Sequence, residues 1–159
     1  MRATWLESEK PMAMSELLAQ GVHYEQWPTK EGAYQTCVDV LMEARGYVEQ
    51  DIIDLSEATP GLDALCERFI DEHLHSDDEV RFVLAGEGIF DIRSTDDRWM
   101  RVLVEAGDLI VVAAKRHHRF LLTDQRRIRC VRLFKDRSGW VPEYRRCSED
   151  TGSVSAVRV

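Results

Sequence analysis

The sequence predicts a mainly β fold, an antiparallel β-barrel or sandwich preceded by a few α-helices. Three observations support this prediction. Short apolar runs recur from Val80 onward, clusters of Gly, Ser, Thr and Asp separate these runs, and apolar residues at helical spacing occur before residue 72. Regularly spaced short strands joined by tight turns are typical of a small barrel or sandwich.

Residues 1–72 are expected to form an N-terminal strand and helices that pack on the barrel. The chain is expected to begin with an edge strand and a short helix, which Ser15 caps and Gly21 ends. A second helix is expected over residues 31–46, where Gly46 is the stop signal. Its helical spacing is carried by Tyr34, Cys37, Val38, Leu41 and Arg45.

A third helix is expected to lead directly into the candidate site. Thr59 and Pro60 have the residue types of an N-cap and a first helical residue, and a short extended piece, residues 51–55, precedes them. The apolar stripe of this helix consists of Leu62, Leu65, Cys66, Phe69 and Ile70. A helix that ends beside the first candidate ligand would help to hold that ligand at a fixed height.

Residues 73–144 are expected to form the barrel core, in a single domain with the N-terminal part. The strands are expected near residues 80–85, 89–93, 99–104, 109–112, 118–123 and 128–134. Hairpin turns are expected at Gly86-Glu87-Gly88, Ser94-Thr95-Asp96-Asp97 and Ala106-Gly107-Asp108. Residues 145–159 are polar and small, which predicts a flexible tail.

Composition and charge limit the possible functions. The net charge of −8 argues against a nucleic-acid-binding protein, because neutralising phosphates requires an excess of Lys and Arg. The first residues lack the apolar stretch of a signal peptide and no run is long enough to span a bilayer, which favours a cytoplasmic protein without membrane contact. The four cysteines have no C-x-x-C spacing and are interpreted as reduced thiols. The absence of a long exposed apolar stripe favours a monomer.

The candidate functional residues lie in the stretch Glu72–Arg81. If this stretch is extended with a short turn in its middle, four of its side chains face one way, because strand side chains alternate between faces. These residues are His73, His75, Glu79 and Arg81. Imidazole and carboxylate ligands suit a divalent first-row transition metal, and two histidines with one carboxylate form the facial triad of non-haem iron oxygenases. A His-x-His pair alone is weak evidence for a metal, and the carboxylate and arginine strengthen it.

A further pair of histidines, His117 and His118, stands beside a predicted strand later in the chain. One of them could supply a fourth ligand from a strand that faces the first three. The spacing of the residues does not decide which of the two does so.

Several blocks of the sequence resemble the acireductone dioxygenase family of the cupin superfamily. The spacing His73-x-His75-x3-Glu79-x6-Gly86 follows the ligand part of the first cupin motif, and Gly107 with a later histidine follows the second. The blocks of the narrower family stand in family order across residues 69–134: Glu72-His73-Leu74-His75, Asp78-Glu79-Val80-Arg81-Phe82, Gly88-Ile89-Phe90-Asp91-Ile92-Arg93, Trp99-Met100-Arg101-Val102, Gly107-Asp108-Leu109-Ile110, His118-Arg119-Phe120 and Arg132-Leu133-Phe134.

The resemblance implies a cupin-type antiparallel β-barrel, or jelly-roll, that binds one Fe²⁺ or Ni²⁺ ion per chain. The implied metal ligands are His73, His75, Glu79 and His118. The resemblance selects His118 over His117 because His118 precedes an Arg-Phe pair, as in the family. It also implies pocket positions for Phe69, Phe90 and Phe120, which would form an apolar wall, and Arg132 is expected to face the same pocket.

The implied activity is cleavage of acireductone, 1,2-dihydroxy-3-keto-5-methylthiopentene, by O₂ in methionine salvage. With iron the products would be 4-methylthio-2-oxobutanoate and formate, and with nickel methylthiopropionate, formate and carbon monoxide. Arg81 is expected to be the catalytic residue that is not a ligand, because a guanidinium on the ligand face can hold an oxygen of the anionic enediol.

Two departures from the family pattern and two alternatives qualify this expectation. Ala113 and Lys115 stand where the family usually has proline and glycine. If the family glycine has a positive φ, Lys115 must bear that φ at a cost of about 1 kcal/mol, or the turn has changed. Glu67 replaces the glycine that opens the first cupin motif. The alternatives are another cupin metalloenzyme, such as a sugar isomerase or a different small-molecule dioxygenase, and a non-enzymatic cupin that senses a small molecule.

Overall fold

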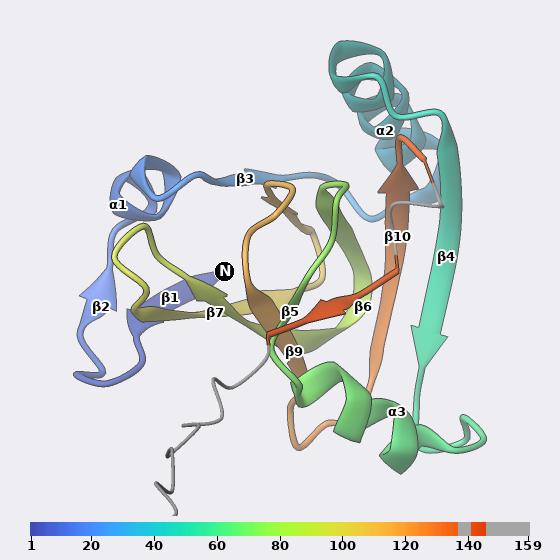
Figure 1. Ribbon diagram of the computed structural model, residues 1–159. Helices are drawn as coiled ribbons and strands as arrows, with labels where there is room; N and C mark the ends of the chain where they lie inside the picture. The colour runs from blue at the N-terminus through green and yellow to red at the C-terminus, as the bar shows by residue number, and fades with distance from the viewer. Residues whose placement is uncertain (137–140, 146–159) are drawn as a thin grey trace, which may run out of the picture.

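One long strand, β6, organises the barrel (Figure 1). The structure is a computed structural model that describes residues 1–136 and 141–145. The first half of β6 pairs with β8 and β10 and the second half with β7 and β9, all antiparallel. The bounds of these strands are β6 (Glu79–Arg93), β7 (Trp99–Glu105), β8 (Asp108–Val112), β9 (His118–Leu122) and β10 (Ile128–Phe134). Thus β6 passes from one sheet into the other.

The expected hairpin at residues 86–88 is wrong, because these residues continue β6. Gly86 has a φ of +74°, and the register with β10 shifts between Arg129 and Cys130. The amide of Glu87 still donates to the carbonyl of Arg127 at 3.0 Å, so hydrogen bonding continues past the glycine. A positive φ combined with a bulge bends a strand and does not reverse it. Gly86 therefore marks the point where β6 changes sheets.

The other two expected turns are present, with one difference. Residues 94–97 join β6 to β7 as a hairpin, with the amide of Asp97 donating to the carbonyl of Ser94 at 3.1 Å. The turn at 106–107 connects β7 to β8, but it is no hairpin, because β8 pairs with β6 and β3 and not with β7. This turn carries the chain from one sheet to the other.

Strands from the N-terminal part extend both sheets. In one sheet the order is β11-β5-β9-β6-β7-β1-β2, and in the other β8 pairs with β3 and β10 with β4. These strands are β1 (Arg2–Trp5), β2 (Pro11–Met12), β3 (Val22–Gln26), β4 (Glu49–Leu55), β5 (His73–Leu74) and β11 (Glu143–Tyr144). The predicted mainly β fold, an antiparallel barrel with a few helices outside it, is confirmed. The flexible tail predicted from residue 145 onward lies, apart from Arg145, outside the described residues.

The three helices occur where they were expected, with different N-termini for two of them. They are α1 (Met14–Ala19), α2 (Glu31–Arg45) and α3 (Leu62–Ile70). Ser15 lies inside α1, and Ala13 at the N-cap position makes no side-chain capping bond. Thr59 accepts a hydrogen bond from the amide of Ser56 at 3.0 Å and so belongs to the preceding turn. Gly61, with a φ of +69°, separates that turn from α3. Gly46 ends α2 in the left-handed conformation, as expected.

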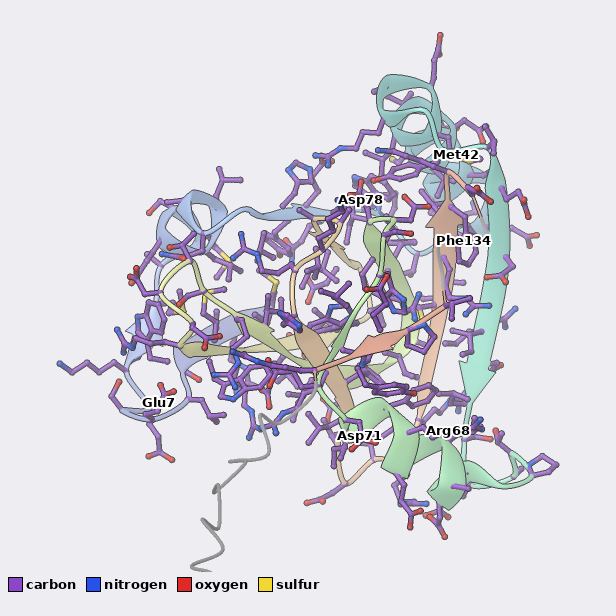
Figure 2. The ribbon with its side chains drawn as sticks, in the orientation of Figure 1. Glu7, Met42, Arg68, Asp71, Asp78 and Phe134 are labelled. Atoms are coloured by element: carbon purple, nitrogen blue, oxygen red, sulfur yellow. The ribbon has the colours of Figure 1, made fainter. Side chains whose placement is uncertain are left out.

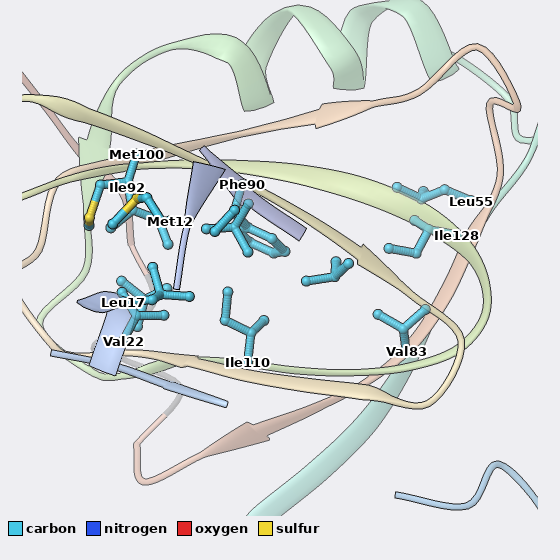
Figure 3. Close-up of a cluster of buried hydrophobic side chains, with 14 of the residues drawn as sticks. Met12, Leu17, Val22, Leu55, Val83, Phe90, Ile92, Met100, Ile110 and Ile128 are labelled. Atoms are coloured by element: carbon cyan, nitrogen blue, oxygen red, sulfur yellow. The ribbon is translucent and has the colours of Figure 1, made fainter. Parts of the chain in front are cut away.

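Two hydrophobic clusters hold the sheets and helices together. The inner cluster fills the barrel and includes Val83, Phe90, Ile92, Met100 and Ile110 (Figure 3). The outer cluster lies between α2 and the β8–β6–β10 sheet and includes Tyr34, Val38, Phe82, Leu109 and Val131. Because this sheet is covered on both faces, every residue of β8 is buried. Among the described residues, no helix is long and apolar enough to cross a membrane.

Candidate metal centre

Strand pairing brings three histidines from two separate parts of the chain together. His73 of β5 lies directly opposite His118 of β9, and β9 in turn pairs with β6. His75 follows two residues after His73, just before β6 begins at Glu79. One ring nitrogen from each of the three histidines lies within 4.8 Å of the others, and all three side chains are buried. His73 and His75 lie between Asp71, which follows α3, and Asp78, which precedes β6; Figure 2 labels both aspartates.

Glu79 adds a carboxylate to the three histidines. Its Oε2 lies 3.7 Å from His75 Nε2 and 4.0 Å from His118 Nε2, while its Oε1 accepts a bond from Arg81 Nη2 at 2.8 Å. Oε2 is buried and has no hydrogen-bond partner among the described residues. A buried carboxylate oxygen without a partner is costly. A cation held between this oxygen and the imidazoles would satisfy it.

Hydrogen bonds to backbone carbonyls orient two of the three imidazoles. The Nδ1 atom of His73 lies 2.6 Å from the carbonyl of Asp71, and that of His118 lies 2.9 Å from the carbonyl of Arg116. A carbonyl only accepts hydrogen bonds, so each Nδ1 carries a proton and Nε2 is the ring nitrogen that is left to bind a metal. Burial lowers the pKa of His118 to about 4 and also lowers the pKa of His75, although the Glu79 carboxylate acts in the opposite direction. Neutral imidazoles are the metal-binding form.

These four side chains therefore fit a divalent transition-metal ion. Divalent transition-metal ions bind imidazole nitrogens together with carboxylate oxygens. Mg²⁺ and Ca²⁺ prefer oxygen ligands alone, so three imidazoles argue against them. His117, the alternative fourth ligand, is partly exposed and does not join the cluster among the described residues. Its backbone carbonyl instead accepts a bond from the amide of Arg93 at 2.9 Å.

Hydrogen bonds fasten the loop before His118 to the loop after His75. Asp78 accepts bonds from the amide of Ala114 at 3.0 Å and from the hydroxyl of Tyr47 at 2.7 Å. The amide of Lys115 donates to the carbonyl of His75 at 2.7 Å. Lys115 has a φ of +62°, so it takes up the left-handed conformation itself. The two ligand-bearing loops are thus held at a fixed separation.

A cavity of about 270 Å³ opens beside the cluster. All four candidate ligands line it, together with Arg81, Phe69 and Phe120. The rings of Phe69 and Phe120 meet edge to face, with centroids 6.0 Å apart. The cavity therefore joins a polar, metal-binding end to an aromatic wall.

Two residues expected in the pocket lie elsewhere. Phe90 is only 1% exposed and packs behind Phe120 in the inner cluster, with ring centroids 5.0 Å apart. Arg132 forms a two-bond ion pair with Asp51, at 2.7 and 2.6 Å, and is not among the residues that line the cavity. Asp51 of β4 lies directly opposite Arg132 in the sheet, which explains the pairing.

Several lining residues were missed by reasoning from the sequence. Ile128 and Cys130 of β10 line the cavity, and their alternation along the strand could have placed them there. Burial raises the pKa of the Cys130 thiol to about 11. Pro142 and Tyr144 also line the cavity, but they belong to a segment with only a two-residue strand, which leaves no periodic signal.

Comparison with known proteins agrees with this site. The family model "ARD/ARD′ family" matches residues 5–142. The chain is 42% identical over 142 residues to an acireductone dioxygenase of Heterostelium pallidum, covering 89% of this chain and 96% of the relative. It is 39% identical over 161 residues to an acireductone dioxygenase of Bacillus pumilus, covering 89% and 91% of the two chains.

A solved structure agrees as well. An acireductone dioxygenase from Bacillus anthracis, with a cadmium ion in its active centre, superposes with a TM-score of 0.82 at 32% identity, covering 90% of this chain and 97% of that one. The cupin-type barrel is therefore shown by structure as well as by sequence. The chain belongs to the ARD/ARD′ family and is, like its relatives, an enzyme of the dioxygenase class.

Proposed function

We propose that this enzyme cleaves acireductone, 1,2-dihydroxy-3-keto-5-methylthiopentene, with O₂ in the methionine salvage pathway. The protein would act as a cytoplasmic monomer. The observation that carries the proposal is the cavity itself, which is lined both by three imidazoles and the Glu79 carboxylate and by the rings of Phe69 and Phe120. The substrate has the matching chemistry, because it combines an ionisable enediol with an apolar methylthio tail.

The proposed metal ligands are His73, His75, Glu79 and His118, and the proposed ion is Fe²⁺ or Ni²⁺, one per chain. When bound, such an ion supplies Lewis-acid and template chemistry at this end of the cavity. The ligand set does not discriminate between the two metals, because both accept nitrogen and oxygen donors. With iron the products would be 4-methylthio-2-oxobutanoate and formate, and with nickel methylthiopropionate, formate and carbon monoxide.

Arg81 is the proposed catalytic residue that is not a ligand. Arg81 lines the cavity, its side chain is 14% exposed, and its guanidinium is held in place by the 2.8 Å ion pair with Glu79. A guanidinium remains charged at all relevant pH values and donates several hydrogen bonds in a fixed plane. It can therefore hold an oxygen of the enediolate, while Phe69 and Phe120 contact the methylthio group.

The test is product analysis on protein reconstituted separately with Fe²⁺ and Ni²⁺. Acireductone is added without oxygen, oxygen is then admitted, and oxygen uptake, the keto acid and carbon monoxide are measured. We expect the keto acid with iron and carbon monoxide with nickel. Absence of oxygen uptake with both metals, on protein shown to contain them, would exclude the proposal.

An Arg81→Ala variant separates the role of Arg81 from that of the ligands. It should keep its metal and lose turnover, because the substrate loses a hydrogen-bonding cation while the four ligands remain. Metal content is measured by elemental analysis beside the rate. Loss of the metal together with the activity would show that Arg81 supports Glu79 and does not act on the substrate.

A further inference from the structure

The segment 141–145 forms one wall of the cavity. Its strand β11 pairs with β5, with Tyr144 directly opposite His73 and Glu143 opposite Leu74. Figure 1 shows β11, in orange-red, running across the barrel from the side of β10 to β5. Pro142 and Tyr144 line the cavity, whereas Val141 does not line it and is 69% exposed. The ring of Tyr144 lies 5.9 Å from that of His73.

Backbone pairing alone is a weak attachment for this wall. The pairing covers only two residues on each strand, and Tyr144 itself remains 49% exposed. Short ladders without a buried apolar face are marginally stable in water. A further interaction must therefore hold β11 against β5.

Arg145 provides that interaction. Its backbone amide donates to the carbonyl of Glu72 at 3.0 Å, and its Nη1 donates to the Glu72 carboxylate at 2.8 Å. The same guanidinium binds both carboxylate oxygens of Asp97, at 2.8 and 2.9 Å. Asp97 belongs to the β6–β7 hairpin, so Arg145 ties β11 to two separate elements. Arginine suits this position because its planar fork can bind two carboxylates at once.

The same ion-pair network reaches the metal centre. Glu72 immediately precedes His73 and also forms two bonds with Arg93, each at 3.0 Å. Arg93 donates in turn to the carbonyl of Asp97 at 2.8 Å. Two arginines and two carboxylates thus form a charge-balanced cluster. Arg93 and Arg145 hold the pKa of Glu72 below its ordinary value, although burial alone would raise it.

We propose that Arg145 is a positioning residue that holds Pro142 and Tyr144 as the outer wall of the cavity, and that this wall limits the length of the apolar tail that the site accepts. The first part depends only on the structure, and the second part rests on the proposed function. Opening the wall would widen the access of solvent to the cavity, and shortening Tyr144 would lengthen the cavity.

The first part is tested by the accessibility of Cys130, which lines the cavity and is 2% exposed. In a background with Cys37, Cys66 and Cys147 replaced by serine, the metal-loaded protein is treated with iodoacetamide at pH 8.5. The rate of alkylation is read from the intact mass. We expect Arg145→Gln to raise this rate at least about five-fold. Arg126→Gln is the matched control, because Arg126 also pairs with a carboxylate, Asp63 at 2.6 Å, but that pair does not involve the segment 141–145.

The outcome of the alkylation experiment is decisive in both directions. A rate unchanged by Arg145→Gln, or raised equally by Arg126→Gln, would overturn the role of Arg145. The alkylation rate of Arg145→Lys should lie between those of the wild type and Arg145→Gln, because one ammonium cannot reproduce both bonds to Asp97. None of these readouts depends on turnover, so they hold whether or not acireductone is the substrate.

The second part is tested with acireductone homologues that carry longer alkylthio tails. Tyr144→Ala should lower KM for the longer homologues relative to the methylthio compound, and Arg145→Gln should raise KM for the methylthio compound more than it lowers kcat. An unchanged KM ratio in Tyr144→Ala would refute the limit on tail length. If the wild-type protein turns over none of these compounds while Arg145→Gln still exposes Cys130, the proposed function fails and the positioning role of Arg145 stands.

Discussion

Gly88 determines where the Phe120 ring can lie in the cavity wall. A Cβ at position 88 would stand 2.5 and 2.7 Å from two ring carbons of Phe120 and 3.0 Å from Ile128 Cδ1. Phe90 blocks retreat of the ring toward the core, because it is fully packed there. Gly88→Ala should therefore push Phe120 toward the cavity, lower the free energy of unfolding by about 1–3 kcal/mol and raise KM. Urea unfolding and steady-state kinetics measure the two effects.

The double variant Gly88→Ala/Phe120→Leu provides the control for this prediction. The smaller leucine leaves room for the added methyl group, so the double variant should be less destabilised than the sum of the two single changes. Metal content should stay the same in all three proteins, since neither residue is a candidate ligand. Additive losses of stability would mean that the ring and the new methyl group do not meet.

At this scale the sequence predicts the residues whose position follows from local backbone geometry better than those whose position depends on strand pairing. His73, His75 and Glu79 follow from alternation in an extended chain, because alternation depends only on local backbone geometry. His118 followed only from family resemblance, since its approach depends on the pairing of β5 with β9. The placement of Phe90 and Arg132 depends on which strands pair with each other. The positions of the strands along the sequence do not determine this pairing.

At the scale of elements, Gly86 allows β6 to serve two sheets. A Cβ there would lie 2.1 Å from the carbonyl oxygen of Arg127, which is backbone and cannot move aside, and the φ of +74° is unfavourable for alanine. Gly86→Ala should lower the free energy of unfolding by at least about 2 kcal/mol. Gly32→Ala is the matched control: position 32 lies within α2 with no atom in the way, so alanine should add up to about 1 kcal/mol of stability.

Urea unfolding of both variants measures these opposite effects. If Gly86→Ala left the free energy of unfolding unchanged, the strand would be able to bend without a glycine. The sequence alone does not show which role Gly86 has, because Gly-Glu-Gly is as typical of a hairpin turn as of a β-bulge. The choice between them depends on whether β10 lies alongside to continue the hydrogen bonds, which is a tertiary fact. The late start of α3 has a local cause, because the Thr59 hydroxyl accepts a bond from the amide of Ser56 and Gly61 takes the N-cap position.

On the scale of the whole molecule, the proposed metal would bind side chains from separate elements and so link those elements directly. His73 and His75 lie at β5, Glu79 begins β6 and His118 begins β9. Without a cation, the buried Glu79 Oε2 lacks a hydrogen-bond partner among the described residues. An ion that binds only the folded state raises the free energy of unfolding. The increase is about 4 kcal/mol when the free ion concentration is a thousand times Kd.

Metal removal should therefore lower the unfolding temperature of the wild-type protein, by roughly 10 °C for a chain of this size. Calorimetry with excess Ni²⁺ and with a chelator measures the shift. His118→Ala should abolish the shift because it removes one of the four proposed ligands. His117→Ala should retain it, because the partly exposed His117 lies outside the cluster. A shift retained in His118→Ala and lost in His117→Ala would reverse the assignment of the fourth ligand, which depends on the conformation of the turn at Lys115 as much as on the two histidines.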